Sequence, residues 1–157
     1  MSDYCNRSGQ EGDGSAMKLM MFIFLLLVTS QGVAQRDVNV VGFNCYRSGS
    51  ATEVVRKMTD LIAGRKYTEI SLLLSKGSAA EQFLATIVLE KLSTLEQYAL
   101  TNNEKKLMMK IKNSNRKVEV CSGCANFDKV RLRKMFLDEN FLGSAEWLDS
   151  VLVSGKP

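Results

Sequence analysis

The stretch Ser78-Ala79-Ala80-Glu81-Gln82-Phe83-Leu84-Ala85-Thr86-Ile87-Val88-Leu89 carries the clearest structural signal in this chain of 157 residues. Ser78 and Glu81 have the spacing of a capping box, in which each side chain satisfies an exposed backbone N–H group at a helix start. Apolar residues then recur with the 3.6-residue period of a helix that buries one broad face. We therefore predict a long helix from Ala79 to about Tyr98, with its charged residues, Glu81 among them, largely on the opposite side.

Two further pairs with the same spacing, Ser50 with Glu53 and Thr101 with Glu104, predict two more capped helix starts. Apolar residues at helical spacing follow each pair, and a short buried helix is predicted between Tyr67 and Lys76. The predicted fold class is therefore mainly α. We expect a small bundle or short solenoid-like array of about five to six short helices with a short extended lead-in.

In two stretches, apolar and polar residues alternate as they do in strands. Residues 38–45 predict the extended lead-in, and residues 117–120 predict a second extended segment that ends at Cys121. A further helix is predicted after Cys124, with four apolar side chains facing inward: Phe127, Val130, Met135 and Phe136. A last amphipathic helix after Ser144 is predicted to dock onto the core through Trp147, Leu148, Val151 and Leu152.

The short helices from Thr52 through Leu92 resemble HEAT-type helical-hairpin repeats. The resemblance lies in the pairing of Ile70-Ser71-Leu72-Leu73-Leu74 with Ala80-Glu81-Gln82-Phe83-Leu84-Ala85-Thr86-Ile87-Val88-Leu89, and it covers about a third of the chain. The proline and the regular Asp and Arg positions that this family commonly shows are missing. The resemblance implies helix-on-helix packing and a binding scaffold rather than an enzyme.

An apolar run from Leu19 to Val28 follows Lys18 and leads to small residues near Ala34, which is the layout of a secretory signal. This run is too short to cross a bilayer as a helix, which needs roughly 20 residues. The alternative is a buried core helix, which the lack of a polar face disfavours. We predict export, periplasmic or secreted, through the segment Met17 to Ala34, and no transmembrane anchor in the mature chain.

This interpretation divides the chain into two parts. Residues 1–34 are a polar extension plus signal peptide, with the true start at Met1 or Met17, and residues 35–157 are a single helical domain. Histidine is absent, which removes the usual general base and the usual metal ligand. We predict no catalytic residue, no metal and no cofactor, and an enzyme is the less favoured class.

Positive charge is concentrated in one part of the predicted domain. Between Lys105 and Lys134 the chain carries ten basic residues against only Glu119 and Asp128. Such a cluster can attract a protein partner or an anionic surface polymer, although a solvated helix face is the alternative. Nucleic acid is not expected, because export disfavours it and the basic cluster contains one aromatic residue, Phe127, where stacking on single strands would need several. The candidates for anion contact are Lys110, Lys112, Arg116, Lys117, Lys129, Arg131, Arg133 and Lys134.

The motif Cys121-Ser122-Gly123-Cys124 supports more than one interpretation. An extended segment, a Cys-x-x-Cys motif and a predicted helix give the local order of thioredoxin-like redox proteins, in which the first thiol lies at a helix start. A βαβ framework is missing here, and so is the cis-proline that faces the motif, because the only proline is Pro157. A zinc site would need a fourth ligand beside the three cysteines of the predicted domain.

A structural disulfide is the third interpretation of these cysteines. In the chain-entropy model, a bridge from Cys45 to Cys121 or Cys124 contributes roughly 4.5 kcal/mol, whereas a bridge between Cys121 and Cys124 contributes roughly 2 kcal/mol. A stabilising bridge should therefore reach Cys45. Two functions follow: an exported structural or interaction module with a basic contact face, or a thiol-redox or thiol-dependent binding protein that uses Cys121 and Cys124.

Overall fold

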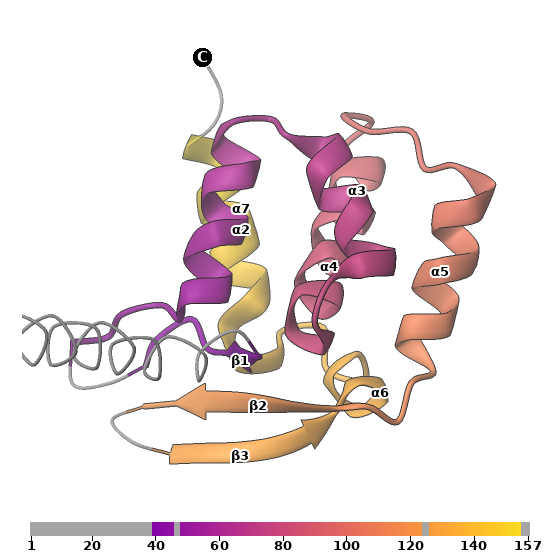
Figure 1. Cartoon of the computed structure of the whole chain (residues 1–157). Coiled ribbons are helices and arrows are strands. Elements are labelled where there is room, and N and C mark those ends of the chain that lie inside the picture. Colours follow the sequence, from indigo (N-terminus) through magenta and orange to yellow (C-terminus); the bar gives the residue numbers. More distant parts are fainter. Residues whose placement is uncertain (1–38, 46–47, 124–125, 155–157) are drawn as a thin grey trace, which may run out of the picture. The chain divides into compact units, whose positions relative to one another are not determined.

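The computed structural model describes residues 39–45, 48–123 and 126–154, all within the compact unit Arg36–Pro157 (Figure 1). The predicted signal segment, the two candidate starts and the division after residue 34 lie outside the described residues. Cys124 lies outside them as well. The predictions that concern these positions therefore remain predictions.

The described part of the chain is mainly helical, as the sequence predicts. Its six α-helices are α2 (Glu53–Ala63), α3 (Tyr67–Lys76), α4 (Ala79–Thr94), α5 (Asn102–Lys112), α6 (Leu132–Met135) and α7 (Ser144–Ser154). A short 3-10 helix, η2 (Phe141–Gly143), precedes α7. The strands are β1 (Val40–Val41), β2 (Lys117–Ser122) and β3 (Asn126–Arg131).

The strands form one small sheet in the order β1-β2-β3. β1 pairs in parallel with β2, and β2 pairs with β3 in antiparallel orientation from Lys117 opposite Arg131 to Ser122 opposite Asn126. The longer helices stand on one side of this sheet (Figure 1). Val118 and Val120 belong to the core that these helices share, so alternation along β2 turns Lys117 and Glu119 to the other face.

Helix α4 forms the centre of the core. It contacts α2, α3, α5 and β2, and buried residues lie all around its circumference in the first two turns. Glu81 differs from its predicted position on the solvent side, because it is buried and its Oε1 accepts a hydrogen bond from Lys57 Nζ at 2.6 Å. An ion pair with a hydrogen bond is what makes a carboxylate tolerable at such a position. The α3–α4 pair that suggested HEAT-type packing is present as two contacting helices.

Two of the three predicted capping boxes are confirmed. Ser78 with Glu81 starts α4, and Thr101 with Glu104 starts α5, each with both reciprocal hydrogen bonds. The prediction for Ser50 with Glu53 is wrong, because α2 begins at Glu53 with Thr52 as N-cap and without a side-chain cap. The Ser50 carbonyl instead accepts a hydrogen bond from the Cys45 N–H group at 2.8 Å, which places Ser50 in a turn.

The predicted helix directly after Cys124 is also wrong. Residues 126–131 form strand β3, and only the four residues of α6 that follow are helical. Six residue pairs with β2 satisfy the backbone of this segment, which outweighs its local helical spacing. Phe127, expected to face inward, is 53% exposed, whereas Met135 is buried as predicted.

The docking of the last helix is confirmed. Leu148 of α7 is buried, and the Trp147 ring centroid lies 5.2 Å from that of Phe43 in the lead-in. The Trp147 Nε1–H group donates to Thr59 Oγ1 of α2 at 3.1 Å. The indole therefore buries its apolar ring and still satisfies its polar group.

Candidate anion-binding surface

The eight predicted anion-contact residues come from consecutive elements of one region. Lys110 and Lys112 lie in the last turn of α5, Arg116 lies in the loop after it, and the others lie on the hairpin and on α6: Lys117, Lys129, Arg131, Arg133 and Lys134. Helix α5 also contacts α6, and α6 contacts β3, so these elements are neighbours in space.

Two of the eight cations are neutralised by carboxylates. Lys112 pairs with Glu90 of α4 and also lies 5.7 Å from the centroid of the Phe136 ring. Lys129 pairs with Glu119 on the neighbouring strand at 3.0 Å. The remaining six make no ion pair within the described part of the chain. These six are Lys110, Arg116, Lys117, Arg131, Arg133 and Lys134.

The hairpin places two of these cations directly opposite each other. Lys117 of β2 is the cross-strand neighbour of Arg131 of β3, on the sheet face that points away from the core. Directly opposed like charges destabilise a sheet by up to about 1 kcal/mol. An anion bound between them would remove this repulsion, so the pair has more to gain from a ligand than scattered surface lysines have.

Two further cations share a pocket. A hollow of about 330 Å³ lies between the end of α3, the start of α4, helix α5 and the loop that follows it. Among the described residues that line it, Lys110 and Arg116 are the only charged ones, and none is a carboxylate. The other lining residues are polar or apolar: Leu74, Ser75, Gln82, Leu107, Ile111 and Ser114.

Arg116 is held at this pocket by several hydrogen bonds. Its Nη1 donates to Gln82 Oε1 at 2.6 Å, and the buried Gln82 in turn donates from Nε2 to the Leu74 carbonyl at 3.1 Å. The Arg116 backbone N–H donates to Ser114 Oγ at 3.2 Å, and its carbonyl accepts from the Leu132 N–H group at 2.9 Å. The backbone bonds hold the loop, and one hydrogen bond, to the neutral Gln82, positions the exposed guanidinium and leaves its charge uncompensated.

The sequence predicts the basic residues of this surface and misses their neutral supports. Gln82 is the most important of these, because it links Arg116 to the backbone of α3. A signal was present, since Gln82 is a polar residue within a run of α4 that is otherwise rich in alanine and other apolar residues. The contribution of Ser114 depends on the loop conformation, which side-chain spacing does not reveal.

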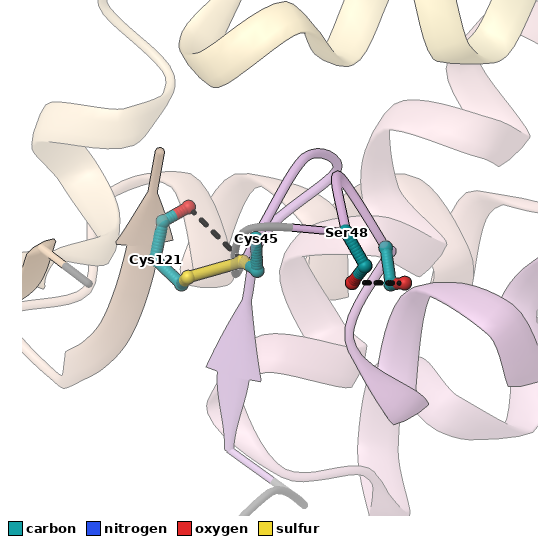
Figure 2. Close-up of a disulfide and its surroundings, with 4 residues drawn as sticks. Cys45, Ser48 and Cys121 are labelled. Atoms are coloured by element: carbon teal, nitrogen blue, oxygen red, sulfur yellow. Dashed lines mark hydrogen bonds between the residues drawn. A yellow bond between two sulfur atoms is a disulfide. The ribbon is translucent and has the colours of Figure 1, made fainter. Parts of the chain in front are cut away.

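The cysteine region lies at the other end of the hairpin. The structure joins Cys45 to Cys121 in a disulfide with a Cα–Cα distance of 5.7 Å, within the normal range for such a bridge (Figure 2). This pairing is one of the two that loop length favours. Cys124 lies outside the described residues, so a dithiol formed by Cys121 and Cys124 remains a hypothesis.

Gly42 makes room for this disulfide. A β-carbon at this position would lie 2.7 Å from the Cys121 carbonyl oxygen and closer still to Cys45 Sγ. Cys45, Cys121 and Val40 form a small buried cluster apart from the main core. The disulfide thus anchors the lead-in to β2 at Cys121, the residue after the last β1–β2 pair, Val41 with Val120.

Metal sites and membrane-spanning helices each need a particular grouping of residues. Among those that the structure describes, no three His, Cys, Asp or Glu side chains come together in a group that could hold a metal ion. No helix in the described ranges has the length and apolar character needed to span a membrane. No protein family, no curated protein and no solved structure matches the chain.

Proposed function

We propose that this protein is an exported helical interaction module that binds an anionic polymer through the basic surface formed by α5, the α5–β2 loop, the hairpin and α6. The observation that carries the proposal is the number of uncompensated cations on these elements, with Lys117 directly opposite Arg131. A surface with several unpaired charges of one sign attracts a polyanion over a distance of about a Debye length.

The export part of the proposal is supported by two observations. The run from Leu19 to Val28 has the layout of a secretory signal. The disulfide between Cys45 and Cys121 is of the kind that persists in oxidising surroundings outside the cytosol.

The proposal is tested by binding of the mature chain, from Gln35 onward, to heparin as a model polyanion at salt concentrations from about 50 to about 500 mM. We expect retention at low salt and release at high salt. The double variant Lys117→Gln/Arg131→Gln should bind roughly three- to tenfold more weakly at low salt, from the loss of two exposed charges. The same variant should fold at least as stably, because the cross-strand repulsion is gone.

A matched control is provided by the double variant Arg56→Gln/Lys76→Gln, which removes the same charge from exposed positions on α2 and α3. The control should bind heparin nearly as tightly as the unmodified chain. If both double variants bound heparin equally weakly, net charge alone and not the proposed surface would explain the binding. Heparin binding that does not change with salt concentration would also rule the proposed surface out.

A further inference from the structure

The pocket at Arg116 has features of a ligand site that the open hairpin surface lacks. Its volume of about 330 Å³ is at the lower end of the range for small-molecule sites. Its two cations come from separate elements, Lys110 from α5 and Arg116 from the loop. Apolar side chains from α3 and α5 form the wall beside them, with Leu74 and Ile111 buried and Leu107 partly buried.

The guanidinium of Arg116 is exposed and keeps most of its donors for a ligand. One of its five N–H groups is used by Gln82, and the other four make no hydrogen bond within the described residues. An arginine that one hydrogen bond already orients loses less conformational freedom, when an oxyanion binds to its planar edge, than an arginine without such a bond. The second cation, Lys110, adds a point charge to the same hollow.

We propose that this pocket binds an organic phosphate monoester, with the phosphoryl group on Arg116 and Lys110 and a compact apolar body against Leu74, Leu107 and Ile111. This inference rests on the proposed function, because the phosphate ester would be a group of the anionic partner. The two cations match the charge of a phosphate dianion better than that of a single carboxylate. The apolar wall favours an ester over the free inorganic ion.

The test is calorimetric titration of the mature chain with phenyl phosphate, inorganic phosphate and benzoate. Phenyl phosphate should bind most tightly, since it alone combines two negative charges with an apolar ring. The variants Arg116→Gln and Lys110→Gln should weaken this binding, Arg116→Gln by roughly ten- to a hundredfold, because a charge-assisted hydrogen bond is lost. Arg116→Lys should recover only part of the affinity, because lysine keeps the charge and loses the planar fork.

Lys106→Gln is the matched control, because Lys106 lies on α5 and is exposed but does not line the pocket. This variant should bind phenyl phosphate as the unmodified chain does, and circular dichroism should show all variants folded. Phosphatidylcholine vesicles that contain phosphatidate show whether a lipid headgroup binds better than the soluble ester. Binding that depends on Arg116 with either probe supports the pocket.

Unchanged affinity in a folded Arg116→Gln variant would overturn the inference, and so would equal affinity for phenyl phosphate and inorganic phosphate. The outcome is separable from that of the proposed function. The variant Lys117→Gln/Arg131→Gln should keep full affinity for phenyl phosphate while losing affinity for heparin. A chain that binds heparin but not phenyl phosphate would support the proposed function and contradict the phosphate pocket.

Discussion

At the scale of single residues, Glu104 is the carboxylate with the most hydrogen bonds in the described chain. Its Oε1 accepts hydrogen bonds from Ser71 Oγ of α3 and from the Tyr98 hydroxyl, the latter at 2.6 Å. Its Oε2 accepts from the backbone N–H and the side-chain hydroxyl of Thr101, both at 2.7 Å. Burial alone would raise the pKa of Glu104, but these donors outweigh it and lower the pKa to about 2.

This pKa predicts a specific dependence of stability on pH. The folded-state pKa of about 2 lies below the ordinary value of 4.5, so the ionised carboxylate stabilises the fold above about pH 4.5. The stabilisation is lost progressively as the pH falls from about 4.5 to about 2. We expect Glu104→Gln to lower the free energy of unfolding by about 3 kcal/mol at pH 7 and by much less near pH 2.5. Urea unfolding at both pH values measures the difference.

A control for this prediction is Asp60→Asn, which neutralises an exposed carboxylate of α2. It should change the free energy of unfolding by less than about 0.5 kcal/mol at either pH. If Glu104→Gln lowered the free energy of unfolding by the same amount at both pH values, the charge of the carboxylate would not be the source of the stabilisation. That result would contradict the prediction.

At the scale of elements, the sequence predicts the helices α2 to α5 and α7 and the extended segments that contain β1 and β2, but it misses β3. Start signals such as Ser78 with Glu81 lie within one turn, so that local spacing is sufficient to identify them. Strand β3 depends on pairing with β2, and the spacing of its Phe127 and Val130 is equally compatible with a helix. Ser50 has the right neighbour at Glu53, but its backbone pairs with Cys45 in a local turn, and Thr52 takes the N-cap position of α2.

The two serines give a matched test at this scale. Ser78→Ala removes a side chain that caps α4 by accepting from the Glu81 N–H group, and it should cost about 1 kcal/mol of folding free energy. Ser50→Ala removes a half-buried hydroxyl that caps no helix and, among the described residues, bonds only Ser48 at 2.7 Å. It should cost less than about 0.5 kcal/mol. Thermal unfolding of both variants makes the comparison, and equal costs would contradict the assigned start of α2.

The candidate site was only partly predictable from the sequence, because some of its residues are brought together only by tertiary packing. The charges of Lys110 and Arg116 are visible as a cluster of basic residues, because they lie close together in the chain. The pocket between them also needs Leu74 and Gln82, which are distant in sequence and join it only through packing of α3 and α4 against α5. Tertiary packing likewise decides whether a cation pairs with a carboxylate, as the ion pair between Lys112 and Glu90 shows.

At the scale of the whole molecule, the disulfide connects the start of the described chain to its middle. Cys45 and Cys121 are separated by 76 positions, and helices α2 to α5 lie between them. Closing a loop of this length restricts the unfolded chain and stabilises the fold by about 4.5 kcal/mol in the chain-entropy model. The bridge therefore stabilises the helical core and attaches the lead-in to β2, at the end of the hairpin away from Lys117 and Arg131.

We expect the double variant Cys45→Ala/Cys121→Ala to lose about 2 to 5 kcal/mol of folding free energy, because its unfolded state is no longer cross-linked. Urea unfolding of the oxidised chain and the variant measures this loss, and Cys124→Ser should unfold like the oxidised chain. Peptide mapping without reduction should recover Cys45 joined to Cys121. A map that joins Cys121 to Cys124 instead, with a reversible bridge, would remove the structural role of Cys45 and favour the thiol-redox hypothesis.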